Sequence, residues 1–154
     1  MDLLALHARL TRLPAGRWLF SRAVCLKAPY FASIAPRIDA LAPSRCVVSF
    51  AHRRRVTNHI GTVHAIALCN AAELAAGLAT EAGLPSAMRW IPKGMQVEYL
   101  AKAVGRMTTT AQVAAPLDVG DAREVPVRVE VADPQGTPVF RATVAMWVSP
   151  RPAR

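Results

Sequence analysis

The residues best suited to chemistry lie between positions 58 and 73. Asn58, Gly61 and His64 follow one another at intervals of three residues, and Glu73 comes nine residues after His64. A carboxylate can accept a proton from water, while an amide or an imidazole can position the reacting groups. These residue types could take part in acid–base chemistry, with Glu73 as the candidate general base.

Glu73 lies within a stretch, 63–82, that is rich in Ala and Leu and ends at Gly83. This pattern predicts a helix that is apolar nearly all round, and such a helix must be enclosed by other elements. Burial of an unpaired carboxylate disfavours its charged form, which suits a general base. The alternative is a structural role, in which Glu73 caps a neighbouring group or pairs with an arginine from a strand.

His64 and Glu73 are not expected to reach one site from a single helix. Nine residues at about 100° each place them on opposite sides if His64 lies in the first turn. We therefore expect a homodimer or a dimer of dimers, in which a site takes loop 58–64 from one subunit and Glu73 from the other. Alternatively, His64 precedes the helix and only forms a hydrogen bond within the loop.

The start of this helix is a candidate binding site for an oxyanion. Thr62 can cap the helix by accepting a hydrogen bond from its first turn, which leaves the amides of Ala65 and Ile66 to face a ligand. The positive end of the helix would then stabilise the negative oxygen formed by attack on a carbonyl.

The elements that must position these residues form an α+β pattern. Two helices are expected at 3–13 and 17–27, and the second either packs across the domain or touches lipid. The strand with alternating Val residues contains Pro126. A proline within a strand argues for an edge position or an irregular start of that strand. The expected strands, which would form an antiparallel sheet of about five around the long helix, are 44–51, 95–102, 107–114, 123–132 and 138–148.

The spacing Asn-x-x-Gly-x-x-His, with an acid nine residues later, resembles the hotdog-fold thioesterases of the phenylacetate-pathway type. The strand that begins Met95-Gln96-Val97 is similar to that family's first strand after the helix. The resemblance covers about residues 36–148 of a single domain, 1–154, and leaves 1–35 as a helical extension.

The resemblance implies hydrolysis of acyl-coenzyme A at sites built between paired subunits. Glu73 would be the base or nucleophile, Asn58 the positioning residue and His64 the loop histidine before the helix. In that family two glycines follow the histidine, whereas Ala65 and Ile66 follow it here. This difference favours an alternative function, a non-catalytic hotdog module that binds an acyl thioester or another small ligand.

The chain is basic, with 19 Lys and Arg against 10 Asp and Glu, so it is expected to attract polyanions. Nucleic acid is not the expected partner, because no helix-turn-helix, zinc-finger or aromatic RNA-binding motif accompanies the charge. The phosphates of coenzyme A and a membrane surface are alternative partners. The candidate residues for the phosphates, each otherwise plain surface charge, are Arg53, Arg54, Arg55, Lys93, Lys102 and Arg106.

Several classes of protein are excluded by the composition. No apolar stretch is long enough for a transmembrane helix, since 65–79 is interrupted by Asn70 and Glu73. The three cysteines form no C-x-x-C pair and indicate buried, reduced thiols in a cytoplasmic protein. The ligand types His52, His59, His64 and Glu73 match no metal-binding spacing, and no dinucleotide motif is present, so we expect no metal and no cofactor.

Overall fold

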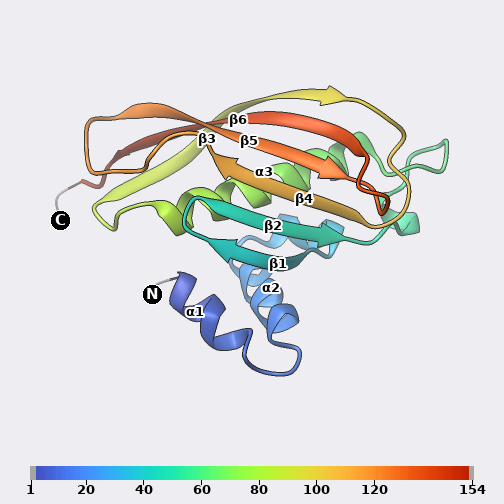
Figure 1. The fold of residues 1–154 in the computed structure, drawn as a ribbon, viewed down its shortest axis with the longest axis horizontal. Coiled ribbons are helices and arrows are strands. Elements are labelled where there is room, and N and C mark those ends of the chain that lie inside the picture. Colours follow the sequence, from blue (N-terminus) through green and yellow to red (C-terminus); the bar gives the residue numbers. More distant parts are fainter. Residues whose placement is uncertain (1–2, 153–154) are drawn as a thin grey trace.

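The computed structural model describes residues 3–152. Its strands form one antiparallel, six-stranded sheet in the order β1-β2-β4-β5-β6-β3, and this sheet wraps around the long helix α3, Ala65–Gly83 (Figure 1). The predicted α+β class is confirmed, with six strands where about five were expected. The strands are β1 (Arg37–Ala42), β2 (Arg45–Phe50), β3 (Met88–Tyr99), β4 (Met107–Val113), β5 (Arg123–Ala132) and β6 (Pro138–Pro150).

The strand that the sequence pattern did not predict is β1. It is short, prolines at 36 and 43 flank it, and its register with β2 shifts between Ile38 and Ala40. Arg37 and Asp39 form an ion pair at 2.6 Å within it. A strand with charged residues and an irregular register shows no regular apolar alternation, so it gives no periodic signal.

The two strand prolines occupy different positions in the sheet. Pro92 lies at a register shift in β3, an edge strand that pairs with β6, where the loss of a donor is tolerated. Pro126 lies in β5, between β4 and β6, so the prediction of an edge position is wrong. Its carbonyl accepts a hydrogen bond from the Ala114 N–H at 3.0 Å, just beyond the end of β4. Strand β4 ends at Val113, so the position opposite Pro126 lies beyond the regular hydrogen bonding between β4 and β5. The absence of an N–H on Pro126 therefore removes no bond of that ladder.

Apolar burial between α3 and the sheet forms the core. The alternating valines of β5, from Val125 to Val131, are at most 3% exposed, and most of the Ala and Leu residues of α3 are buried. Each fully buried Val or Leu stabilises the fold by about 1.5–3 kcal/mol before conformational entropy is considered. The small Ala side chains let the sheet approach the helix closely, so α3 is enclosed over most of its circumference.

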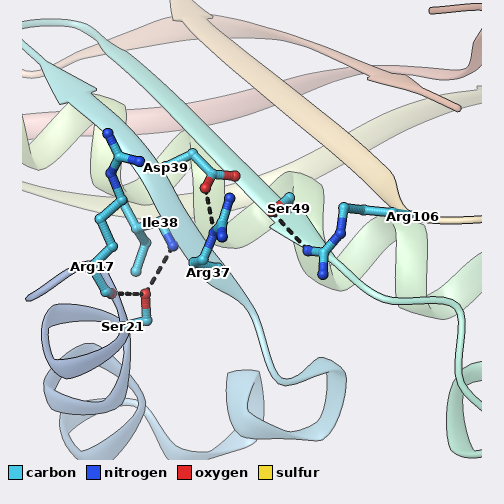
Figure 2. A network of polar contacts seen from close by, with 7 residues as sticks. All are labelled: Arg17, Ser21, Arg37, Ile38, Asp39, Ser49 and Arg106. Atoms are coloured by element: carbon cyan, nitrogen blue, oxygen red, sulfur yellow. Dashed lines mark hydrogen bonds and ion pairs between the residues drawn. The ribbon is translucent and has the colours of Figure 1, made fainter. Parts of the chain in front are cut away.

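The N-terminal residues form α1 (Leu3–Leu10), α2 (Gly16–Lys27) and a 3-10 helix, Pro29–Ile34. Phe20 of α2 is fully buried and joins the same core as α3. The Ser21 hydroxyl accepts a hydrogen bond from the Ile38 N–H of β1 at 2.8 Å and donates to the Arg17 carbonyl at 2.6 Å (Figure 2). This contact satisfies a backbone donor of an edge strand, so the helical extension is bonded to the sheet.

These helices and strand β3 lie at opposite edges of the sheet. Figure 1 shows α1 and α2 beside β1, while β3 is the last strand at the other end of the strand order. No helix in the described part of the chain is long and apolar enough to cross a membrane.

Candidate active site

The loop before α3 is organised by the side chain of Asn58. Its Oδ1 accepts hydrogen bonds from the N–H groups of Ile60 and Thr62, both at 3.1 Å, and its Nδ2 donates to the Thr62 hydroxyl at 2.8 Å. Gly61 has a φ of +79°, in the left-handed region that favours glycine, and its N–H donates to the Asn58 carbonyl. Asn58 and Gly61 therefore act together to shape the loop.

His64 is the residue that caps α3. Its Nδ1 accepts a hydrogen bond from the Ile66 N–H at 3.0 Å, so the prediction that Thr62 caps the helix is wrong. Thr62 is buried and bonded to Asn58 instead. The Ala65 N–H has no acceptor among residues 3–152. At the positive end of α3, this leaves the Ala65 amide open to an incoming oxygen atom.

Glu73 lies on the exposed side of α3, and the prediction that its carboxylate is buried within the chain is wrong. It shares this side with Ile66, which is 56% exposed, and with half-buried Cys69. Its carboxylate forms no hydrogen bond or ion pair within residues 3–152. The helix pattern indicated enclosure all round, but the sheet ends at β3 and leaves this side uncovered.

A tyrosine that the sequence analysis did not select lies beside this side of the helix. The Tyr99 hydroxyl lies 3.7 Å from the Cys69 sulfur. This hydrogen bond, together with burial and the nearby Cys69 charge, raises the pKa of Tyr99. Tyr99 follows Met95 and Val97 in the alternation of β3, and that period-two pattern was the available signal that it faces α3.

The other end of the uncovered side is closed by Trp90 of β3. A Cβ atom on Gly77 would lie 2.8 Å from the Trp90 ring, so glycine permits this contact. The Trp90 indole N–H donates to the Glu81 carboxylate at 2.6 Å. We call Ile66, Cys69, Glu73, Trp90 and Tyr99 the α3–β3 face. Within this face Glu73 carries a carboxylate with no partner in the described chain.

The two halves of the predicted site are not brought together within one chain. His64 and Glu73 are nine residues apart along α3, which corresponds to a separation of about 13 Å along the helix axis. Within one chain, loop 58–64 and Glu73 therefore lie at separate places along α3.

The basic candidates are also dispersed. Lys93 lies over the Trp147 ring, 4.7 Å from its centroid, and Trp147 alternates with the buried residues of β6 that face α3. Lys93 therefore lies on the outer side of the sheet. Arg54 is exposed just before the loop 58–64, Arg55 donates to the Ala32 carbonyl at 2.8 Å, and Arg106 donates to Ser49 at 3.3 Å (Figure 2).

The cysteines are free thiols, and two of them are buried. Burial raises the pKa of Cys46 to about 12 and also raises the pKa of Cys25, so neither supplies a thiolate nucleophile near neutral pH. In the described residues, no three His, Cys, Asp or Glu side chains gather in a group that could hold a metal ion.

Comparisons with known proteins agree with this architecture. The model of a family described as a domain of unknown function, DUF4442, matches residues 16–148, and no curated protein matches the chain. Among solved structures, the structural-genomics protein APC5556 is 44% identical, with a TM-score of 0.82 over 97% of this chain and 99% of that one.

More distant structures show the same fold. The probable thioesterase PA5026 from Pseudomonas aeruginosa is 21% identical, with a TM-score of 0.75 over 90% of this chain and 97% of that one. A thioesterase family protein from Silicibacter pomeroyi is 19% identical, with a TM-score of 0.70 over 85% and 96%. The resemblance to hotdog-fold thioesterases is thus confirmed at the level of fold. Since the family model spans most of the chain, the protein belongs to the DUF4442 family.

Proposed function

We propose that the protein hydrolyses acyl thioesters of the acyl-coenzyme A type, with Glu73 activating water or attacking the thioester carbonyl. The observation that carries this proposal is the free carboxylate of Glu73 on the uncovered side of a helix that is otherwise enclosed. Solved structures with this fold include proteins named as thioesterases, which supports the reaction class. In the general-base form, water adds to the carbonyl carbon, its proton passes through Glu73, and the thiolate leaves as the protonated thiol.

The active form is a homodimer that pairs through the α3–β3 face. Strand β3 is an edge strand of the sheet formed by residues 3–152, and an unpaired strand edge is a template for another strand. If two copies of α3 lie antiparallel across a two-fold axis, the Glu73 of the partner subunit lies beside His64 when the axis passes about midway, near Cys69. Cys69 lies on the required side of the helix.

The residues around the helix start then bind and polarise the substrate. The Ala65 amide donates to the developing oxyanion, and the positive end of α3 adds to this stabilisation. Asn58 holds the loop in shape, His64 fixes the first turn through its bond to Ile66, and exposed Arg54 attracts the coenzyme phosphates.

A second candidate function, binding of an acyl thioester without turnover, is favoured by one observation. The Ile66 amide is already bonded to His64, and a partly exposed Ile66 side chain stands where the resembling family has a glycine. Both features reduce the donors that can approach a substrate carbonyl.

The test is thiol release from short, long and aromatic acyl-coenzyme A by the purified protein and by Glu73→Gln. Loss of a general base lowers turnover by about 10²–10⁴-fold, while the amide keeps the size of the side chain and the fold. The matched control is Glu81→Gln, on the same helix, which should retain turnover because its amide oxygen can still accept from Trp90.

The possible outcomes separate the two functions. Equal turnover by Glu73→Gln and the unaltered protein contradicts the role of Glu73. No thiol release, together with a higher melting temperature in the presence of coenzyme A derivatives, supports the binding module. No release and no thermal shift contradict both functions.

A further inference from the structure

Helix α2 exposes large apolar side chains that neither the core nor the proposed active site uses. Leu26 is 81% exposed, Tyr30 of the following 3-10 helix 71%, Trp18 59% and Leu19 43%. Isolated exposed apolar residues are common, but a group on one helix is typical of an interaction surface. We call these four residues, with Arg22 and Lys27, the α2 patch.

The patch has an amphipathic geometry on the outward side of α2. Leu19 and Leu26 are seven residues apart, about two helical turns, and so lie along one line. Arg22 and Lys27 lie on the two sides of that line by the same periodicity. The buried residues of the helix, which include Phe20, Ser21 and Cys25, pack against the domain.

The charged residues of the helical extension are all of one sign. Residues 3–35 contain Arg9, Arg12, Arg17, Arg22 and Lys27 and no Asp or Glu. None of these five side chains forms an ion pair with a carboxylate of residues 3–152. The Arg22 guanidinium lies 6.0 Å from the centroid of the Trp18 ring, which joins a cation to the apolar group. A surface that combines cations with apolar side chains is complementary to a partner that has negative charge at its surface and apolar groups below that surface.

From this combination, we propose that the α2 patch binds the surface of anionic phospholipid membranes. The leucines and Trp18 enter the boundary between headgroups and acyl chains, Tyr30 lies at the headgroup level, and the cations contact lipid phosphates. A second copy fits this surface poorly, because a two-fold contact through the patch brings Arg22 and Lys27 of each copy together. Membrane binding also leaves the β3 edge free, since α2 lies beside β1 at the other edge of the sheet (Figure 1).

The experiment is co-sedimentation of the full chain with vesicles of phosphatidylcholine alone or with about a quarter phosphatidylglycerol. We expect binding to the anionic vesicles that decreases with added salt, and weaker binding to the neutral ones. Leu26→Glu should weaken binding to anionic vesicles at least about tenfold, because it removes apolar insertion and adds a repelled charge. The fold is not at risk, since the Leu26 side chain is exposed.

The matched control is Val119→Glu, the same change of charge at an exposed apolar residue outside the α2 patch. It should bind vesicles like the unaltered protein. Fluorescence provides an independent readout: anionic vesicles should shift the emission to shorter wavelength, and Trp18→Phe should remove the shift although Trp90 and Trp147 remain.

Three results would overturn the proposal. The first is no binding of the unaltered protein to anionic vesicles at low salt. The second is equal weakening by Leu26→Glu and Val119→Glu, which would show a nonspecific charge effect. The third is a change in oligomeric state caused by Leu26→Glu without any vesicle binding, which would assign the patch to a second copy of the chain.

Discussion

Apolar side chains are exposed at both edges of the sheet, but the two edges offer different chemistry. The α3–β3 face combines Ile66 and Tyr99 with the free carboxylate of Glu73 and with an edge strand. The α2 patch combines Leu19 and Leu26 with Arg22 and Lys27 on a helix. The backbone of a helix is bonded internally, so the patch offers side chains only, whereas an edge strand also offers backbone donors and acceptors. Exposed apolar area alone therefore does not identify a partner. An edge strand favours pairing with another protein strand, whereas a helix with cations favours a lipid surface.

The largest expected effect separates the two surfaces directly. Ile66→Glu should weaken dimerisation by about a hundredfold or more, because it places an unpaired carboxylate in the proposed interface. The isolated chain should fold normally, since Ile66 is exposed in the first turn of α3, where a negative charge is favourable. Analytical ultracentrifugation measures the change.

The reciprocal variant is the control for this prediction. Leu26→Glu should leave the dimer intact, and Ile66→Glu should retain binding to anionic vesicles. Mild oxidation should link two copies through Cys69, the cysteine that is not buried, and Ile66→Glu should abolish that link. A dimer of unchanged affinity in Ile66→Glu would show that subunits do not pair through the α3–β3 face.

A smaller effect is expected where α1 packs against α2. A Cβ atom on Gly16 would lie 1.7 Å from the Leu10 carbonyl oxygen, so Gly16→Ala requires the backbone to move. Overpacking of this kind costs about 1–3 kcal/mol, and the melting temperature should fall by several degrees. Gly94→Ala is the matched control, because nothing lies within 4 Å of its added Cβ. Equal melting temperatures for both variants would show that α1 contributes little to stability.

The smallest expected effect is the pH dependence of His7. This residue is buried, its ring packs edge-on against Phe20 at 4.9 Å, and its Nε2 has no hydrogen-bond partner in the described chain. Burial, and then the charge of Arg17, lowers the pKa of His7 from its ordinary value of 6.5. The unfolded chain therefore binds a proton more readily than the folded one, so stability is complete above pH 6.5 and declines as the pH falls toward the lowered pKa.

Thermal unfolding from about pH 8 to about pH 5 measures this effect. The unaltered protein should lose more stability than His7→Leu over this range, because the variant has no group to protonate at this position. Parallel curves for the two proteins would show that His7 does not contribute to the pH dependence of stability.

Much of the fold was predictable because it is encoded in local periodicity. The boundaries of β5 match the prediction at 123–132, and α3 begins two residues after the predicted start. Strand β1 was missed because Arg37, Asp39 and the flanking prolines interrupt any alternation. Pairing with β2 stabilises that strand, and a pairing partner is not visible in the strand's own residues.

The geometry of the loop before α3 was only partly predictable from its residues. Asn58, Gly61 and His64 do lie in one loop before α3, yet His64 rather than Thr62 caps the helix, because the loop uses the Thr62 hydroxyl to bind Asn58. Lys93 lies beside Trp147 on the outer side of the sheet, since the register shift after Pro92 sets the side to which each later residue of β3 points.

The sequence by itself determined that one long apolar helix lies within an antiparallel sheet, because the spacing of apolar residues specifies which elements form and that they must be covered. The direction in which Glu73 points was decided only by the tertiary structure. A helix that is apolar all round has no preferred outward side, so the side left uncovered depends on where the sheet ends. In this protein the sheet ends at β3, and Glu73 lies on the side of α3 that remains exposed.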